Sequence, residues 1–336
     1  MVSEETGHGA QYSAGGKQAS AVPKPLSAAR PVQPQGKIPP VMTTRRIFLQ
    51  TLAGSAVMSQ FRLFDTLRAQ GALKHPATGT IGLQLYSLRH LFEKGDIPGT
   101  LRMVRDWGFT DVEAAGTYKL AAADFAAQVK KAGLRIASTG ADFTLLAKDV
   151  GSVIKDAQAF GAQQVMCAWI PHQSGRFSRA DLDKAVPVFT SAGKAMRDAG
   201  LRLLYHVHGY EFQQGPDGTL FDALARQTEP GVVDFQMDVF WVVHGGGNPV
   251  DLFARYPTRF PSTHLKDMRK GTKINEPTGN APDDTSVALG EGMVDIPGIL
   301  RAANKAGVKM HFIEDEHPQS EKQIPRSLQY LAKLTL

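Results

Sequence analysis

The sequence predicts an α/β fold in which eight parallel strands close into a (β/α)8 barrel. Two observations lead to this prediction. From Thr78 onward, short apolar runs alternate with helix-like segments, the order that places parallel strands beneath covering helices. Eight such runs fit into the 260 residues from 77 to 336, which is the strand number and the length typical of a barrel of this kind.

The junctions between the predicted helices and strands share one pattern. A glycine ends each helix-like segment, and an apolar run begins a few residues later. Such a glycine can adopt the left-handed conformation that ends a helix. The pattern occurs at Gly108, Gly133, Gly161, Gly200 and Gly307.

The predicted strands follow from these junctions. The first opens the body of the chain, and the second to fifth and the eighth come after a glycine junction. The sixth and seventh are apolar runs that end in polar residues. An open, doubly wound sheet is the structural alternative, but no Gly-x-Gly-x-x-Gly turn follows the first strand. The eight predicted strands are Ile81–Ser87, Asp111–Ala115, Arg135–Thr139, Gln164–Trp169, Leu201–His208, Val233–Val239, Ser262–Lys266 and Lys309–Glu314.

Ionisable residues gather where the predicted strands end. In a barrel of this type the carboxyl ends meet at one mouth, where its chemistry is found. On the fifth strand, alternation places His206 and His208 on one face, and Glu211 can fold back over them if the chain turns near Gly209. The other strand ends carry Glu113, Asp238, His264, Lys266 and Glu314.

Taken together, these side chains indicate a metal site. Carboxylates clustered in this way would repel one another without a cation. The mixture of oxygen and nitrogen ligands suits Mn²⁺, Co²⁺ or Zn²⁺, with Mg²⁺ also acceptable. Each residue also has a purely structural interpretation: Asp238 as a loop cap, His206, His208 and His264 as satisfied core histidines, and Glu314 as the partner of Lys266.

From about Thr78 to the C-terminus, the chain resembles the sugar phosphate isomerase/epimerase family, whose members have a xylose isomerase-like TIM barrel. The motifs are fairly specific for the superfamily and weak for the substrate. They are Leu83-Gln84-Leu85-Tyr86-Ser87-Leu88-Arg89, Asp111-Val112-Glu113, Tyr205-His206-Val207-His208-Gly209-Tyr210-Glu211-Phe212, Met237-Asp238-Val239-Phe240-Trp241, His264-Leu265-Lys266-Asp267, Leu289-Gly290-Glu291-Gly292-Met293-Val294-Asp295 and Phe312-Ile313-Glu314-Asp315-Glu316.

The resemblance implies one divalent ion held by Asp238, His264 and Glu314. The glutamate that the family carries on the fifth strand has no clean counterpart. His206 stands in its place, and Glu211 lies farther along the chain. Either His206 or His208 replaces the missing ligand, or Glu211 reaches in from the loop.

The resemblance also implies proton abstraction next to a carbonyl, with the metal polarising the substrate oxygens. Glu314 supplies one of the two catalytic groups, and the opposite group is His206, His208 or Glu211. Lys266 is either an oxyanion partner or a salt-bridge partner. The residues expected to contact a sugar are Tyr86, Glu113, Trp169 and Trp241.

Three functions are compatible with these residues and with the resemblance. The first is a metal-dependent isomerase or epimerase of a small carbohydrate or keto-sugar. The second is a metal-dependent lyase or dehydratase of keto-inositols or 3-keto-glycosides, because a histidine base opposite a glutamate acid suits elimination. The third is a sugar-binding barrel without catalysis. An oligomer is compatible with all three.

Residues 1–76 are predicted to be a disordered extension with an export signal, and residues 77–336 to be the catalytic barrel. Arg45 and Arg46, followed by Phe48, Leu49 and a moderately apolar stretch, resemble a twin-arginine signal. A basic turn before an amphipathic helix is the alternative. The resemblance implies the twin-arginine export machinery as a partner, a periplasmic or secreted location, and no stable membrane insertion of the mature protein.

Charge argues against a nucleic-acid partner. The net charge is +6, but residues 1–76 alone hold nine Lys or Arg against three acidic residues, a difference of +6. The predicted barrel is therefore neutral and lacks the basic surface that binds phosphate backbones. The single cysteine, Cys167, excludes an intramolecular disulfide.

Overall fold

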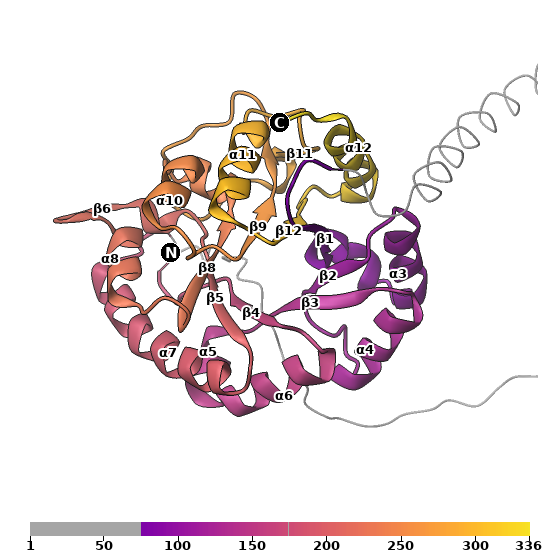
Figure 1. Cartoon of the computed structure of the whole chain (residues 1–336), viewed down its shortest axis with the longest axis horizontal. Helices are drawn as coiled ribbons and strands as arrows, with labels where there is room; N and C mark the ends of the chain where they lie inside the picture. The colour runs from indigo at the N-terminus through magenta and orange to yellow at the C-terminus, as the bar shows by residue number, and fades with distance from the viewer. Residues whose placement is uncertain (1–74, 174) are drawn as a thin grey trace, which may run out of the picture. The chain divides into compact units, whose positions relative to one another are not determined.

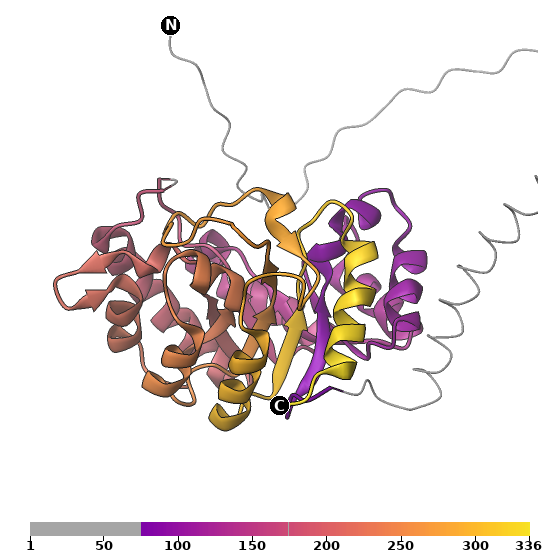
Figure 2. The ribbon, with the colours of Figure 1, turned by 90° about the horizontal axis from the view of Figure 1, so that it is seen from above.

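A computed structural model of the chain describes residues 75–173 and 175–336. Eight parallel strands form a closed barrel (Figure 1), which confirms the predicted fold and excludes the open sheet. The last strand pairs with the first, and Figure 2 shows the two side by side. The strands are β1 Thr80–Gln84, β2 Asp111–Ala114, β3 Arg135–Gly140, β4 Gln164–Cys167, β5 Arg202–His206, β8 Val233–Asp238, β9 Ser262–Leu265 and β12 Met310–Ile313.

Three strands end two or three residues earlier than predicted: β1 at Gln84, β4 at Cys167 and β5 at His206. At β1 and β5, side chains bind the backbone beyond the strand. The side chain of Gln84 accepts a hydrogen bond from Tyr86 N, which starts a 3-10 helix in place of a longer β1. After β5, the carboxyl group of Glu211 accepts a hydrogen bond from His208 N, and the chain turns at Gly209 with φ of 91°. The residues after these strands therefore lie in loops at the mouth.

Helices cover the outside of the barrel (Figure 1). The predicted glycine stops are confirmed at Gly161 and Gly307, whose φ values of 70° and 78° end α6 and α11. The α-helices are α2 Arg89–Phe92, α3 Ile97–Asp106, α4 Ala122–Lys131, α5 Phe143–Lys148, α6 Val150–Phe160, α7 Arg179–Asp198, α8 Leu220–Gln227, α9 Val239–His244, α10 Pro249–Arg255, α11 Ile296–Ala306 and α12 Ser320–Lys333.

The loops at the mouth contain short strands and 3-10 helices. The segment between β9 and α11 leaves and returns through an antiparallel pair of two-residue strands. The Asp267 carboxylate fastens the returning segment, accepting hydrogen bonds from the backbone of Gly290, Gly292 and Val294. The short elements are η1 Leu85–Leu88, η2 Tyr210–Phe212, η3 Asp283–Thr285, β6 Gln214–Gly215, β7 Gly218–Thr219, β10 Asp267–Met268 and β11 Ser286–Val287.

The predicted disordered extension and export signal fall almost wholly in residues 1–74, which lie outside the described residues. Within residues 75–173 and 175–336, no helix combines the length and the apolar character needed to cross a bilayer.

Candidate metal and active site

The register of the parallel strands brings three of the predicted ligands together. Asp238 on β8 and His264 on β9 are direct partners across the sheet. His206, at the end of β5, is the partner of Gln236, which precedes Asp238 by two residues on the same strand. Since alternate residues of a strand face the same side, His206, Asp238 and His264 converge. One ligand atom from each lies within 4.8 Å of the others.

Asp238 divides its two oxygens between structure and the cluster. Oδ1 accepts a hydrogen bond from Trp241 N at 2.9 Å and caps α9. Oδ2 is buried and has no hydrogen-bond partner in residues 75–173 and 175–336. It lies 3.6 Å from His206 Nε2 and 3.9 Å from His264 Nδ1. Asp238 therefore caps a segment after its strand, as the purely structural interpretation predicts. It also presents its second oxygen to the two imidazoles.

A hydrogen-bonded network behind the cluster orients both imidazoles. The Gln236 amide nitrogen donates to Glu113 Oε2 at 2.8 Å. Its oxygen is therefore left to accept from His206 Nδ1, 2.9 Å away, which places the lone pair of this ring on Nε2, facing Asp238. Glu113 Oε1 lies 2.5 Å from His264 Nε2 and fixes that ring in the same way. Such outer partners set the orientation and tautomer of metal-binding histidines.

The two imidazoles differ in charge. Burial alone would lower the pKa of His264, but the carboxylates of Glu113 and Glu314 outweigh it and raise this pKa to about 10. His264 is therefore protonated at neutral pH and donates from both nitrogens. Burial, and then the charge of His264, lowers the pKa of His206 to about 4, so this ring is neutral.

The donor set fits a divalent cation. A fully buried carboxylate oxygen without a donor is costly, at about 1–3 kcal/mol or more. Burial accordingly raises the pKa of Asp238. Two imidazole nitrogens and one carboxylate oxygen facing a common point are typical of zinc and of related first-row metals.

Glu314 and Lys266 flank the cluster. Glu314 Oε2 lies 3.1 Å from His264 Nδ1 and 3.9 Å from Lys266 Nζ. Lys266 is almost fully buried, pairs with Glu316 at 2.8 Å and lies about 5 Å from the ring of Trp241. Burial would raise the pKa of Glu314, but His264 and Lys266 outweigh it and lower this pKa. Glu314 is thus an ionised carboxylate beside the three converging residues.

Glu211 does not join the three converging residues. Its carboxyl group is fully buried and accepts hydrogen bonds from the Tyr205 hydroxyl and from His208 N. Burial, as the largest cause, raises its pKa to about 7. Its predicted roles as metal ligand and catalytic group stay predictions, and the contacts observed lie within its own loop and β5.

The predicted sugar-contacting residues separate into two groups. Glu113 is fully buried and hydrogen bonded to Gln84, Gln236 and His264. These are the contacts observed for its carboxylate, and its contact with a sugar stays a prediction. Trp241 is also buried, whereas Tyr86 and Trp169 are partly exposed.

His208 also lies among aromatic rings. It is partly exposed and stacks on Trp241 with ring centroids 4.7 Å apart. It meets Trp169 edge-on at 5.5 Å. Burial, as the largest cause, holds the pKa of His208 well below its usual value. A neutral imidazole therefore lies between two indoles.

Sequence reasoning based on charged residues missed Gln84 and Gln236, the uncharged amides that bind Glu113. For Gln236 a signal exists in the alternation of β8, because this residue lies two positions before Asp238 and so faces the same way.

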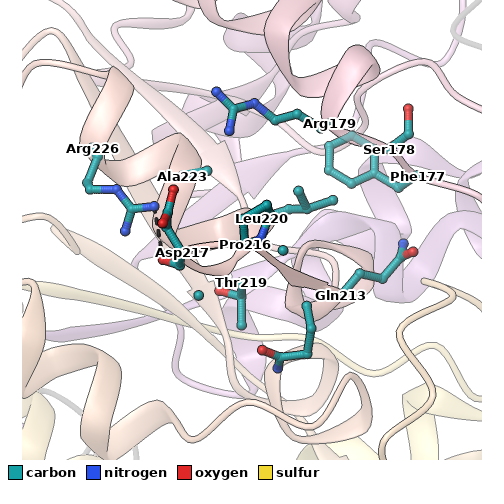
Figure 3. A pocket seen from close by; sticks show the side chains of 13 residues that line it. Phe177, Ser178, Arg179, Gln213, Pro216, Asp217, Thr219, Leu220, Ala223 and Arg226 are labelled. Carbon is teal, nitrogen blue, oxygen red and sulfur yellow. Dashed lines mark hydrogen bonds between the residues drawn. The ribbon is translucent and has the colours of Figure 1, made fainter.

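A pocket of about 230 Å³ lies elsewhere on the barrel. Figure 3 shows it between the β6–β7 hairpin and the starts of α7 and α8, with Arg179 and Arg226 at its edge. None of its lining residues belongs to the converging cluster. The pocket is therefore separate from the candidate metal site.

Comparison with known sequences finds one family and partial relatives. The profile of the family described as "Xylose isomerase-like TIM barrel" matches residues 101–334. An inosose dehydratase of Geobacillus kaustophilus is 28% identical over 123 residues, which is 37% of this chain and 39% of the relative. The match thus spans about two fifths of the length of this relative.

Solved structures show the same architecture. A sugar phosphate isomerase/epimerase from Parabacteroides distasonis is similar with a TM-score of 0.64 and 24% identity, over 78% of this chain and 97% of that chain. The IOLI protein with a binding zinc atom is similar with a TM-score of 0.58 and 14% identity, over 75% and 95%. At these identities the similarity concerns the fold.

Proposed function

Because the chain belongs to the xylose isomerase-like TIM barrel family, we propose that it is a metal-dependent enzyme of the sugar isomerase and epimerase group. The proposed reaction begins with removal of a proton from the carbon next to the carbonyl of a carbohydrate or keto-sugar. The observation that carries the proposal is the unpartnered Oδ2 of Asp238, within 4 Å of one nitrogen each of His206 and His264 in the described part of the chain.

His206, Asp238 and His264 would hold the cation, with Glu314 beside them. When bound, a divalent ion polarises the substrate oxygens and makes the adjacent C–H group more acidic. Imidazole binds metals in its neutral form, so His264 gives up its Nδ1 proton on binding. The zinc atom bound by the similar IOLI protein supports this assignment of a metal.

Two side chains of the protein supply the proton chemistry in this proposal. His208 is a neutral imidazole at the mouth, and its Nδ1 has no hydrogen-bond partner within the described ranges. It is thus ready to accept a proton. Burial would lower the pKa of Lys266, but Glu316 and Glu314 outweigh it and raise this pKa. Lys266 therefore stays positively charged and can stabilise a developing oxyanion.

A dehydratase is the second candidate, and one observation favours it. Glu211 is bound to Tyr205 and His208, which leaves Glu314 as the carboxylate beside the cluster, across from a histidine. An imidazole base opposite a carboxyl group suits loss of water next to a carbonyl if Glu314 first takes up a proton, which the departing hydroxyl then receives. The partial similarity to an inosose dehydratase also supports this alternative.

Metal analysis and isotope exchange test the proposal. We expect purified protein to retain about one divalent ion per chain. Saturating metal should raise the melting temperature of the chelated protein by about 5–10 °C. In D2O, the loaded protein should exchange the proton next to the carbonyl of 3-ketoglucose or of inosose. When the reaction is repeated in H2O, a product of unchanged mass indicates an isomerase or epimerase, and loss of about 18 mass units indicates a dehydratase. Absence of both metal binding and exchange would refute the proposal.

We also propose export through the twin-arginine route, which rests on Arg45, Arg46 and the apolar stretch after them. In a host that has this route, the mature barrel should accumulate in the periplasm. Replacing both arginines by lysine should retain it in the cytoplasm. Periplasmic accumulation of the double lysine variant would contradict this assignment.

A further inference from the structure

The buried carboxyl group of Glu211 belongs to none of the contacts that the proposed reaction uses. It lies in the loop after β5 and is fully buried. Oε1 accepts hydrogen bonds from His208 N at 3.0 Å and from the Tyr205 hydroxyl. Oε2 has no hydrogen-bond partner among the residues that the structure describes. A single oxygen therefore connects the backbone of His208 to the body of β5.

The same connection extends to the loop after β4. The hydroxyl groups of Tyr205 and Tyr210 are hydrogen bonded at 2.8 Å, and Ile170 N donates to the Tyr210 hydroxyl at 2.9 Å. Tyr205 gives its single proton to Glu211, so Tyr210 supplies the proton between the two hydroxyls. Every proton in this chain of bonds points toward Glu211, which makes its Oε1 the final acceptor.

The two ends of this chain of bonds carry the rings at the mouth. Ile170 follows Trp169 directly, and the Trp169 ring meets the His208 ring edge-on at 5.5 Å. On its other side, His208 stacks on Trp241 with an interplanar angle of 20°. A Cβ at Gly209 would lie 2.5 Å from Trp241 O, so the backbone next to His208 packs closely against the backbone of Trp241.

We propose that Glu211 is a positioning residue, which fixes the imidazole of His208 between Trp169 and Trp241 through these hydrogen bonds. The inference rests on the proposed function, in which His208 accepts the proton. Glu211 acts as an acceptor of two hydrogen bonds. Its negative charge is not required, and neither is contact with a metal or a substrate.

Two substitutions of nearly equal size separate these roles. Gln at position 211 keeps an oxygen that accepts from His208 N and from Tyr205, whereas Leu removes the acceptor and leaves the shape. With 3-ketoglucose in D2O, Glu211→Gln should exchange protons within about threefold of the unaltered protein. Glu211→Leu should lower kcat about 100-fold with little change in KM, because a displacement of the base by about 1 Å costs this much. Equal losses in both variants would overturn the proposal, because the charge itself would then be essential.

A double substitution tests whether Glu211 acts through His208. His208→Asn should remove most of the exchange activity. Adding Glu211→Leu to that variant should cause no further loss, since residues that act as a unit are not additive. A further loss of about 100-fold would show that Glu211 acts elsewhere in the reaction.

A measurement without substrate separates this inference from the proposed function. The His208 ring protons lie over the Trp241 ring, so their NMR signals should be displaced by its ring current and be absent in His208→Asn. The displacement should persist in Glu211→Gln and collapse in Glu211→Leu, while the metal content stays at the unaltered level in both. Should Glu211→Leu fail to fold, Tyr210→Phe, which removes the acceptor of Ile170 N, should reduce the displacement in part.

The two hypotheses then fail in different ways. An unaltered protein that exchanges no protons overturns the proposed function and leaves the NMR result to decide on Glu211. If the His208 signals keep their full displacement in both Glu211→Leu and Tyr210→Phe, the positioning role is overturned, whatever the activity.

Discussion

Asp234 and Asp238 lie at opposite ends of the same strand, β8, in different surroundings. Asp234, at the amino end, accepts a hydrogen bond from Gly231 N and lies 3.5 Å from the guanidinium groups of both Arg202 and Arg259. Asp238, at the carboxyl end, keeps one oxygen without a hydrogen bond from any described residue.

The difference distinguishes a buried ionic cluster that supports the fold from one that awaits a ligand. Arg259 also donates to Ala225 O, Thr228 Oγ1 and Val233 O, so the amino end is held together by the chain's own groups. At the carboxyl end, the open acceptor costs stability and is useful only if something binds there. This division agrees with barrels in general, where chemistry lies at the carboxyl ends of strands and stability at the amino ends.

The comparison predicts its largest effect for Asp238→Asn. This variant should lose stoichiometric metal and slow proton exchange by about 10³-fold or more, because the ion contributes several kcal/mol and each 1.4 kcal/mol or so is tenfold. The metal-free variant should unfold at the same urea concentration as the metal-free parent or a higher one, since a buried carboxylate oxygen that lacks a hydrogen-bond donor has been removed. Isotope exchange and urea titration measure both effects.

Asp234→Asn is the matched control on the same strand. It should keep metal and exchange activity per folded molecule while lowering stability, the reverse of Asp238→Asn. If both variants lost metal, the two ends of β8 would not differ in the proposed way.

Arg259→Met tests the amino end from the partner's side. Removing the buried partner leaves Asp234 with only the half-exposed Arg202 as a counter-charge and should cost about 3–5 kcal/mol of unfolding free energy. Arg202 contacts the same carboxylate but is half exposed, so Arg202→Met should cost less than about 1 kcal/mol. Urea unfolding of both chelated variants measures the difference, and equal costs would contradict the role assigned to burial.

The fold was predictable because its signals are local. Buried parallel strands require apolar runs, and helix ends at Gly161 and Gly307 require a residue that tolerates positive φ. The ends of β1 and β5 were predicted too late. Their limits are set by hydrogen bonds that the side chains of Gln84 and Glu211 accept from Tyr86 N and His208 N, and these bonds leave no trace in the pattern of apolar residues.

The candidate site was predictable only as far as strand register reaches. Parallel strands bring their ends together, so placing His206, Asp238 and His264 at strand ends predicts that they meet. The direction of Glu211 depends on Tyr205, a bond across a turn that no sequence period describes. The ligand and catalytic roles of these residues remain predictions that the experiments above address.

Glu113→Gln tests the same difference between strand ends on β2. The buried carboxylate of Glu113 orients His264 but is not one of the three converging residues. Loss of its charge should weaken the hold on His264 and lower metal affinity about 10–100-fold, as is usual for the outer partner of a metal-binding histidine. Asp111, at the amino end of the same strand, pairs with Arg135, so Asp111→Asn should leave metal affinity unchanged. Competition with a metal-binding dye measures both affinities, and equal losses would contradict the division between strand ends.

The smallest effect concerns Asp222, a partnered carboxylate outside the barrel strands. Burial alone would raise its pKa, but hydrogen bonds from Tyr256, Thr219 and Arg255 outweigh burial and lower the pKa to about 2. Because the folded pKa lies below the unfolded value of about 4, this carboxylate adds stability above pH 4 that is lost as the pH falls toward 2. Asp222→Asn should therefore cost about 1–2 kcal/mol at pH 7, and the difference from the parent should shrink at pH 3. The exposed Asp156 provides the control, since Asp156→Asn should change urea unfolding little at either pH. A pH-independent cost at Asp222 would mean that shape, and not charge, holds this contact together, unlike the charged contact at Asp234.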